Sequence, residues 1–157
     1  MSGYYVGQAC RNGHKITGNV HSGDGSPHCP SCGQPTVSAC EHCQASLRGS
    51  FNSDWVIVGG WSLADHCYAC GKAHPWTEAK SAAVQELADA IEELTDYERS
   101  ILAELLPHIV QETPRSTAAG FKFAAIVEKV TGPGKAVMKD LIKDMAVDVA
   151  KKAMGLP

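Results

Sequence analysis

The chain has 157 residues, and its 14 Lys and Arg against 17 Asp and Glu give a formal net charge of −3. No stretch approaches the ~18 uninterrupted apolar residues of a membrane span, so no membrane-spanning helix is expected. Residues 1–7 contain neither a basic region nor a long apolar region, which argues against a secretory signal. We therefore expect a cytoplasmic protein whose seven cysteines are reduced thiols and not a disulfide framework.

All seven cysteines lie within the first 70 residues, where six of them form three Cys-x-x-Cys pairs. The seventh, Cys10, is followed four positions later by His14, which completes a fourth pair of ligands. Eight thiolate and imidazole ligands are enough to close two tetrahedral zinc sites. The predicted ligands of two Zn²⁺ ions are Cys10, His14, Cys29, Cys32, Cys40, Cys43, Cys67 and Cys70.

The spacing within each Cys-x-x-Cys pair has a physical reason. Two residues between the cysteines allow a tight turn, or knuckle, that directs both sulfurs toward one metal. In the segments 29–33 and 67–71, a glycine directly follows the second cysteine. Glycine permits φ > 0, so that backbone N–H groups can point back at the thiolates. The pair at 40–44 lacks that glycine. His28 is the alternative to His14 as the eighth ligand.

The four ligand pairs combine in one of two ways. Sequential pairing leaves loops of 14 residues (15–28) and 23 residues (44–66) between the paired turns. Each loop suits a short β-hairpin with a zinc at its open end, which is a zinc ribbon, and a strand predicted at 55–58 lies in the second loop. The interleaved alternative is a cross-braced finger. Such fingers usually keep their second and third pairs very close, whereas seven residues separate them here. We therefore favour two tandem zinc ribbons.

Both zinc sites are predicted to be structural. A catalytic zinc usually has three protein ligands and an open position, whereas eight ligands for two metals leave no position open. The sequence contains no His-Glu-x-x-His motif and no zinc-deaminase signature. Redox catalysis by one Cys-x-x-Cys pair is disfavoured, because these pairs do not lie in a βαβ pattern. We expect a protein that is not an enzyme.

Composition changes sharply at about Pro75, after which the chain has helical periodicity to its end. The sequence therefore predicts an α+β fold with two domains. Residues 1–76 are expected to form tandem zinc ribbons built from small β-hairpins and binding two metals. Residues 77–157 are expected to form an all-helical region of about four helices. Trp76, at the junction, is expected to cap the core of the second ribbon.

Capping signals indicate where the helices begin and end. Thr77 is the expected N-cap of the first helix, and Thr95 opens a capping-box sequence for the second. Pro107 is expected to kink or end the second helix. The third helix is expected to start at Thr113, with proline at its first position. The last is expected to span 135–154, with one apolar face and one charged face.

Several short motifs are present together along nearly the whole chain. They are Gly3-Tyr4-Tyr5, Cys-x-Asn-Gly-His at 10–14, Cys-x-x-Cys-Gly at 29–33, Cys40 to Cys43 followed by Leu47-Arg48-Gly49, Cys67 to Gly71 with Pro75-Trp76-Thr77-Glu78, and Thr113-Pro114-Arg115. With these motifs the chain resembles a family of uncharacterised bacterial zinc-ribbon proteins, known as a domain of unknown function. The resemblance implies zinc at the matching cysteines and a bacterial cytoplasmic protein, but no established activity.

Formal charge is distributed unevenly along the chain. Residues 1–76 have no net charge, residues 77–112 have a net charge of −7, and residues 113–157 have a net charge of +4. The helix at 135–154 either packs within the chain, mediates homo-oligomerisation, or docks on an unknown protein partner. Closed metal sites and this amphipathic tail favour a non-enzymatic adaptor, or interaction module.

Two alternatives stay open. Zinc ribbons often bind nucleic acid, although the absence of net charge at 1–76 leaves no basic footprint for phosphates. The helix at 135–154 is also compatible with association to an anionic membrane surface, although aspartates on its charged face weaken that alternative.

Overall fold

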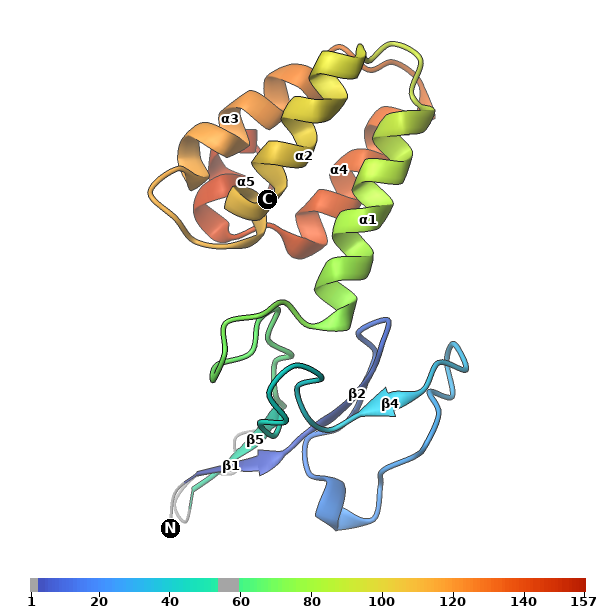
Figure 1. Ribbon diagram of the computed structural model, residues 1–157, viewed down its shortest axis with the longest axis vertical. Coiled ribbons are helices and arrows are strands. Elements are labelled where there is room, and N and C mark those ends of the chain that lie inside the picture. Colours follow the sequence, from blue (N-terminus) through green and yellow to red (C-terminus); the bar gives the residue numbers. More distant parts are fainter. Residues whose placement is uncertain (1–2, 54–59) are drawn as a thin grey trace. The chain divides into compact units, whose positions relative to one another are not determined.

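The computed structural model describes residues 3–53 and 60–157. Within them, small antiparallel sheets precede five helices, which confirms the predicted α+β class (Figure 1). The chain forms two compact units, Met1–Ala79 and Lys80–Pro157, which we call the cysteine-rich unit and the helical unit. The strand predicted at 55–58 lies outside the described residues.

Short strands build the described part of the cysteine-rich unit. They are β1 (Gly3–Val6), β2 (Gln8–Cys10), β3 (Lys15–Thr17), β4 (Thr36–Val37) and β5 (Arg48–Asn52), with one 3₁₀ turn, η1 (Val20–Ser22). β2 lies between β3 and β4 in one antiparallel sheet, and β1 pairs antiparallel with β5 in another. β5 therefore lies in the loop predicted to form the second hairpin, but it pairs with the N-terminal strand. Sheets this small need further stabilisation.

Close backbone contact holds β5 against the loop that follows β3. The Ser50 N–H donates a hydrogen bond to the Gly18 carbonyl at 2.8 Å. A Cβ atom at Gly49 would lie only 2.0 Å from that carbonyl oxygen and 2.8 Å from the Cα of Gly7. Because both neighbours are backbone atoms, only glycine fits at position 49.

The apolar core of the cysteine-rich unit is small. Apart from four cysteines, its buried apolar side chains among the described residues are Ala9, Leu47 and Trp76. The Trp76 Nε1–H donates to the Ala64 carbonyl at 3.0 Å, and a Cβ atom at Gly13 would lie 2.9 Å from the Trp76 Cβ. Trp76 therefore contacts the turn of the first ligand pair as well as the segment before the last pair.

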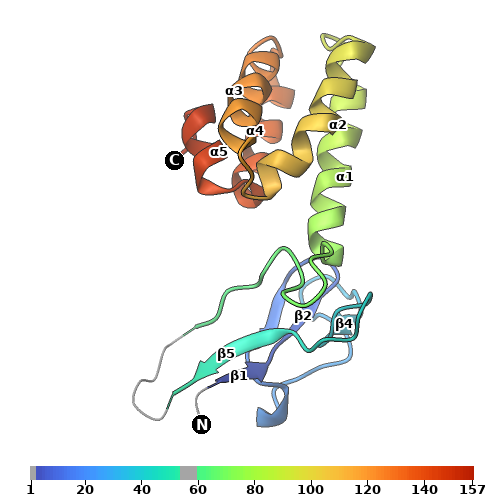
Figure 2. The same ribbon diagram turned by 60° about the vertical axis from the view of Figure 1, so that its left-hand side comes forward.

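The helices are α1 (Pro75–Ala90), α2 (Asp96–Val110), α3 (Ser116–Val127), α4 (Pro133–Met145) and α5 (Asp148–Met154). α3 packs against both α2 and α5, which can be followed in two views (Figures 1 and 2). All five helices contribute to one cluster of eighteen buried apolar residues. No helix in the described part of the chain is long and apolar enough to cross a membrane.

The prediction of one last helix over 135–154 is wrong, because the chain leaves the helical conformation at Ala146 and Val147. Both residues are extended, and the Val147 N–H donates to the Ile109 carbonyl of α2 at 2.8 Å. This bond to another helix compensates for the lost helical turn. Met138, Ile142 and Met145 of α4 are buried in the core of the helical unit, whereas Val137 is 48% exposed. Membrane association of 135–154 stays a prediction.

Two helices begin a few residues away from the predicted positions. α1 begins at Pro75, and the Thr77 hydroxyl donates to the Asp65 carbonyl at 2.8 Å instead of capping the helix. α3 begins at Ser116, whose hydroxyl accepts a hydrogen bond from the Thr113 N–H at 2.8 Å. The Thr77 hydroxyl thus finds a partner outside its expected capping position, whereas the Thr113 hydroxyl still accepts from the Arg115 N–H at 3.2 Å in the turn before α3.

The second helix follows its local signals more closely. Its capping box is confirmed, since the Thr95 hydroxyl accepts from the Glu98 N–H while the Glu98 carboxylate accepts from the Thr95 N–H. Pro107 does not end the helix, which continues to Val110.

Candidate metal centres

The first ligand group comes from a hairpin and a knuckle. Cys10 is the last residue of β2 and His14 directly precedes β3, and the Gly13 N–H closes the turn between them on the Cys10 carbonyl at 2.9 Å. Cys29 and Cys32 lie in the knuckle that precedes β4. Because β4 pairs with β2, this knuckle lies beside the hairpin turn.

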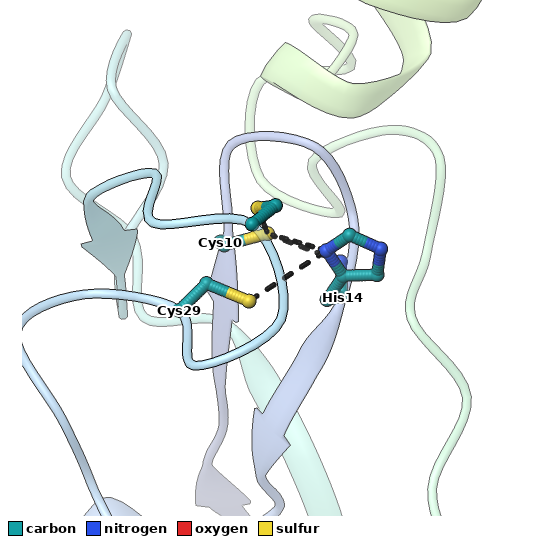
Figure 3. Close-up of side chains that lie close together, drawn as sticks. Cys10, His14 and Cys29 are labelled. Carbon is teal, nitrogen blue, oxygen red and sulfur yellow. Dashed lines mark hydrogen bonds between the residues drawn. The ribbon is translucent and has the colours of Figure 1, made fainter.

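The ligand atoms of this group face one another. The Cys10 Sγ lies 3.4 Å from the His14 Nδ1 and 3.7 Å from the Cys32 Sγ, and the Cys29 Sγ lies 3.6 Å from the His14 Nδ1 (Figure 3). All four ligand atoms lie within 4.8 Å of one another. Cys10 and Cys29 are buried, whereas His14 is exposed.

The second group consists of two knuckles that face each other. Cys40 and Cys43 lie in the first, and Cys67 and Cys70 lie in the second. The Sγ atoms of Cys40 and Cys70 are 3.8 Å apart, and those of Cys43 and Cys67 are 3.6 Å apart. The first cysteine of each knuckle is buried and the second is exposed.

The knuckle at 40–44 adopts the same shape as the others without a glycine. Gln44 has a φ of 62°, close to the 73° and 72° of Gly33 and Gly71. A left-handed conformation is unfavourable for a residue with a Cβ atom. The Gln44 N–H nevertheless closes the turn on the Cys40 carbonyl at 2.9 Å. The geometry of the turn is therefore kept at a conformational cost.

The distances in both groups fit a tetrahedral zinc ion. With Zn–S bonds of about 2.3 Å and Zn–N bonds of about 2.0 Å, a tetrahedron has edges of about 3.8 Å between sulfurs and about 3.5 Å between sulfur and nitrogen. Three sulfur–sulfur distances are 3.6 to 3.8 Å and two sulfur–nitrogen distances are 3.4 and 3.6 Å, and all ligand atoms of a group lie within 4.8 Å of one another. Disulfide bonds would need about 2.0 Å.

Backbone N–H groups favour the thiolate at one cysteine in each group. Burial raises the pKa of Cys29, but the N–H groups of Ser31 and Cys32 outweigh it and lower the pKa to about 6. The N–H of Cys70 likewise lowers the pKa of Cys67 to about 6, against the effect of burial. Because zinc binds thiolates, a lowered pKa reduces the cost of deprotonation on binding.

The pKa of Cys43 is shifted in the opposite direction, which indicates that the second ligand group needs a cation. The Ala45 N–H lowers the pKa of Cys43, but burial and the neighbouring cysteine sulfurs outweigh it and raise the pKa to about 12. Four thiolates this close repel one another, so they cannot all ionise without a positive ion among them. The chemistry of the donor set therefore fits a divalent, thiophilic metal.

The structure brings the eight predicted residues together in the sequential grouping, and His14 occupies the eighth position. His28, the alternative ligand, is exposed and pairs with Pro35 only through the backbone. Neither His42 nor His66 belongs to a ligand group among the described residues. His74 is buried and stacks on Trp76 with ring centroids 4.6 Å apart.

Sequence reasoning missed two contacts that organise these groups. The Asn12 amide donates to the Cys32 Sγ at 3.6 Å, a contact that the motif at 10–14 did not predict. Arg11 forms an ion pair of 2.6 Å with Glu41, which joins the first ligand pair to the third. The only sequence signal was the opposite charge of two residues that lie within different ligand pairs.

A comparison with protein families agrees with the motif pattern, whereas comparisons with individual proteins give no match. No curated protein and no solved structure matches the chain. A family model described as an uncharacterized protein conserved in bacteria (DUF2321) matches residues 3–154. This match covers both ligand groups and nearly all of the helical unit. The chain therefore belongs to the DUF2321 family of uncharacterised proteins conserved in bacteria.

Proposed function

We propose that the chain is a non-enzymatic interaction protein whose cysteine-rich unit is held together by two structural Zn²⁺ ions. One observation carries the proposal: each ligand group offers four donor atoms within 4.8 Å of one another. Four protein ligands complete the coordination of a tetrahedral zinc and leave no position for substrate or water. Zinc at these sites contributes folding free energy rather than Lewis-acid chemistry.

The small core of the cysteine-rich unit is a second reason for a structural role. Full burial of an apolar side chain is worth about 1.5 to 3 kcal/mol, and this unit buries only three besides its cysteines among the described residues. Structural zinc in small domains contributes about 10 to 16 kcal/mol of apparent binding free energy per site near neutral pH. Two such ions therefore stabilise this unit more than its apolar core does.

The adaptor half of the proposal rests on apolar side chains that the helical unit leaves in solvent. Tyr97 of α2 and Phe121 of α3 are 74% and 69% exposed. Exposed aromatic residues are enriched at protein–protein interfaces. In this proposal, the helical unit docks on a protein partner or on a second copy of the chain.

Native mass spectrometry of the purified chain tests the metal half. Two zinc ions per chain are expected. A bound mass that matches an iron–sulfur cluster, or a chain that keeps its folded charge-state distribution without any metal, would contradict the proposal. The same spectra give the oligomeric state.

Site-specific photocrosslinking in the native host tests the docking half. A photoreactive amino acid in place of Phe121 is expected to give a discrete crosslinked product. The matched control carries it in place of Lys152, an exposed residue of α5. Equal products from both positions, or none from position 121, would contradict docking through the surface around Phe121.

A further inference from the structure

A pocket of about 350 Å³ lies in the cysteine-rich unit, beside the second ligand group. Four aromatic side chains from separate parts of the chain contribute to its lining. They are Tyr4, Phe51, Trp61 and Tyr68. Binding sites for small molecules in proteins have volumes of about 300 to 1,000 Å³ and are lined mostly by apolar and aromatic side chains with a few polar groups.

Beside His66 and His74, the described part of the lining contains one formally charged side chain, that of Arg48. Its guanidinium carbon lies 3.9 Å from the ring centroid of Tyr68 and 5.0 Å from that of Tyr4. Stacking on aromatic rings uses the faces of a guanidinium and leaves the N–H groups at its edge free to donate. Those donors form the fork that binds a carboxylate or phosphate through two hydrogen bonds.

No described residue neutralises the charge of Arg48. Among the described residues, Arg48 forms no ion pair, whereas Arg11 and Arg99 each have a carboxylate within 2.8 Å. Within 3–53 and 60–157, no Asp or Glu lines the pocket or the adjoining hollow of about 210 Å³, which shares Tyr4, Arg48 and Tyr68. An unpaired cation in an aromatic pocket selects for an anionic ligand.

The aromatic walls are fixed by the fold. Tyr68 lies inside the knuckle between Cys67 and Cys70, so the second ligand group positions its ring. Tyr4 of β1 lies opposite Phe51 of β5, and their rings meet edge to face at 5.2 Å. The ligand therefore meets side chains that are already arranged, which lowers the entropic cost of binding.

We propose that this pocket binds a small planar aromatic anion, that is, one ring system with a single phosphate or carboxylate group. The rings of Tyr4, Phe51 and Tyr68 stack on the ligand, and the Arg48 fork holds its anionic group. This inference is independent of the docking role proposed for the helical unit.

The charge of the surrounding unit argues for a small ligand and against a nucleic acid strand. Residues 1–79 contain four basic and five acidic residues. One of the basic residues, Arg11, is paired with Glu41. A strand needs a row of cations along its phosphates, whereas a single anionic group needs only Arg48.

Isothermal titration calorimetry with the full-length protein tests the proposal. The probes are adenosine 5′-monophosphate and indole-3-acetate, which present a phosphate and a carboxylate on planar rings. Adenosine and indole lack the anionic group, and inorganic phosphate lacks the ring. At least one anionic probe is expected to bind about tenfold more tightly than its neutral parent and than phosphate, because a charged hydrogen-bonded pair contributes at least that factor.

Matched variants identify the residues involved. Arg48→Gln is expected to weaken binding about tenfold or more, and Arg115→Gln in the helical unit is expected to leave it unchanged. Tyr4→Leu is expected to weaken binding, with the exposed Tyr97→Leu as its control. Each variant must keep the metal content of the parent protein. Tyr4 is chosen over Tyr68 because Tyr4 lies outside the knuckles that carry the metal ligands.

Several results would overturn the proposal. They are an absence of binding by both anionic probes at millimolar concentration, equal affinity for the neutral parents, and an Arg48→Gln variant that binds as the parent does. Affinity for single-stranded oligonucleotides that rises with length and falls steeply with salt would also overturn it, because it would indicate a strand-binding groove.

Discussion

The two units of this chain have nearly the same length but are held together by different forces. The helical unit buries eighteen apolar residues in one cluster. The cysteine-rich unit buries three besides its cysteines among the described residues, and it brings eight metal-ligand residues together in their place. With the proposed zinc ions bound, metal–ligand bonds would replace hydrophobic burial in such a unit, which lets it keep short strands and open loops. The comparison implies that each unit is sensitive to a different perturbation.

Removal of metal is expected to have the largest effect. Chelation, or the Cys67→Ser variant, should unfold the cysteine-rich unit, because roughly 10 kcal/mol or more per site is lost. Amide NMR signals of 3–53 should collapse to the narrow shift range of unfolded chains, while those of α2 to α5 persist. His28→Gln is the control and should keep two zinc ions. Persistence of the dispersed signals of 3–53 after complete chelation would show that the cysteine-rich unit does not depend on metal for its fold.

Truncation of the helical core comes next. Phe123 is 2% exposed in the main cluster, so Phe123→Ala should lower the free energy of unfolding of the helical unit by about 3 to 5 kcal/mol. Phe121→Ala, two residues away on the exposed side, should change it by less than about 0.5 kcal/mol. Urea unfolding followed by circular dichroism gives both values. The zinc content should stay at two per chain, and a loss of zinc in Phe123→Ala would argue against separate sources of stability.

A smaller effect is expected where backbone segments meet in the cysteine-rich unit. Gly49→Ala places a methyl group 2.0 Å from the Gly18 carbonyl oxygen, so β5 must shift. We expect a loss of about 1 to 3 kcal/mol, measured by competition with a zinc chelator. Gly3→Ala is the control, since its added methyl would meet nothing within 4 Å. If the two variants release zinc equally, the close approach at Gly49 does not contribute to the stability of the unit.

The smallest effect concerns an ion-paired carboxylate of the helical unit. Lys135 and Lys139 bind the Glu128 carboxylate at 2.6 and 2.8 Å and lower its pKa to about 2. The pKa of Glu128 is lower in the folded chain than the value of about 4.3 in an unfolded chain. These two ion pairs therefore stabilise the fold at pH values above about 4.3. The contribution should be lost as pH falls from about 5 toward 2.

Glu128→Gln should therefore flatten this part of the pH dependence. The measurement is the urea midpoint of the helical unit, followed by NMR signals of α3 and α4. An exposed carboxylate, Glu92, provides the control variant Glu92→Gln. An unchanged pH profile in Glu128→Gln would show that solvent screens these ion pairs completely.

Local signals in the sequence were sufficient for the ligand residues. The Cys-x-x-Cys spacing at 29–32 and the capping box at Thr95 depend on a few neighbouring residues, and both predict the local structure. The α+β class follows from the same kind of signal, since composition and periodicity change near Pro75.

Features that depend on distant partners could not be predicted. The Thr77 hydroxyl has the chemistry of an N-cap, but a carbonyl twelve residues earlier, at Asp65, takes its hydrogen bond. The pairing of β1 with β5 joins segments more than forty residues apart. The stacking of Arg48 on Tyr68 depends on the knuckle that carries the tyrosine. In each case the outcome was decided by a group that only the folded chain brings into range.

The break between α4 and α5 also determines how long α4 can be. The Ile109 carbonyl belongs to the last turn of α2, where carbonyl groups have no partner within the helix. It is satisfied by the Val147 N–H, which is available only because the chain stops being helical there. One hydrogen bond therefore satisfies groups at the ends of two helices. A residue inserted into α4 would rotate Val147 by about 100° around the helix axis and leave both ends without their partner, so α2 fixes the length of α4.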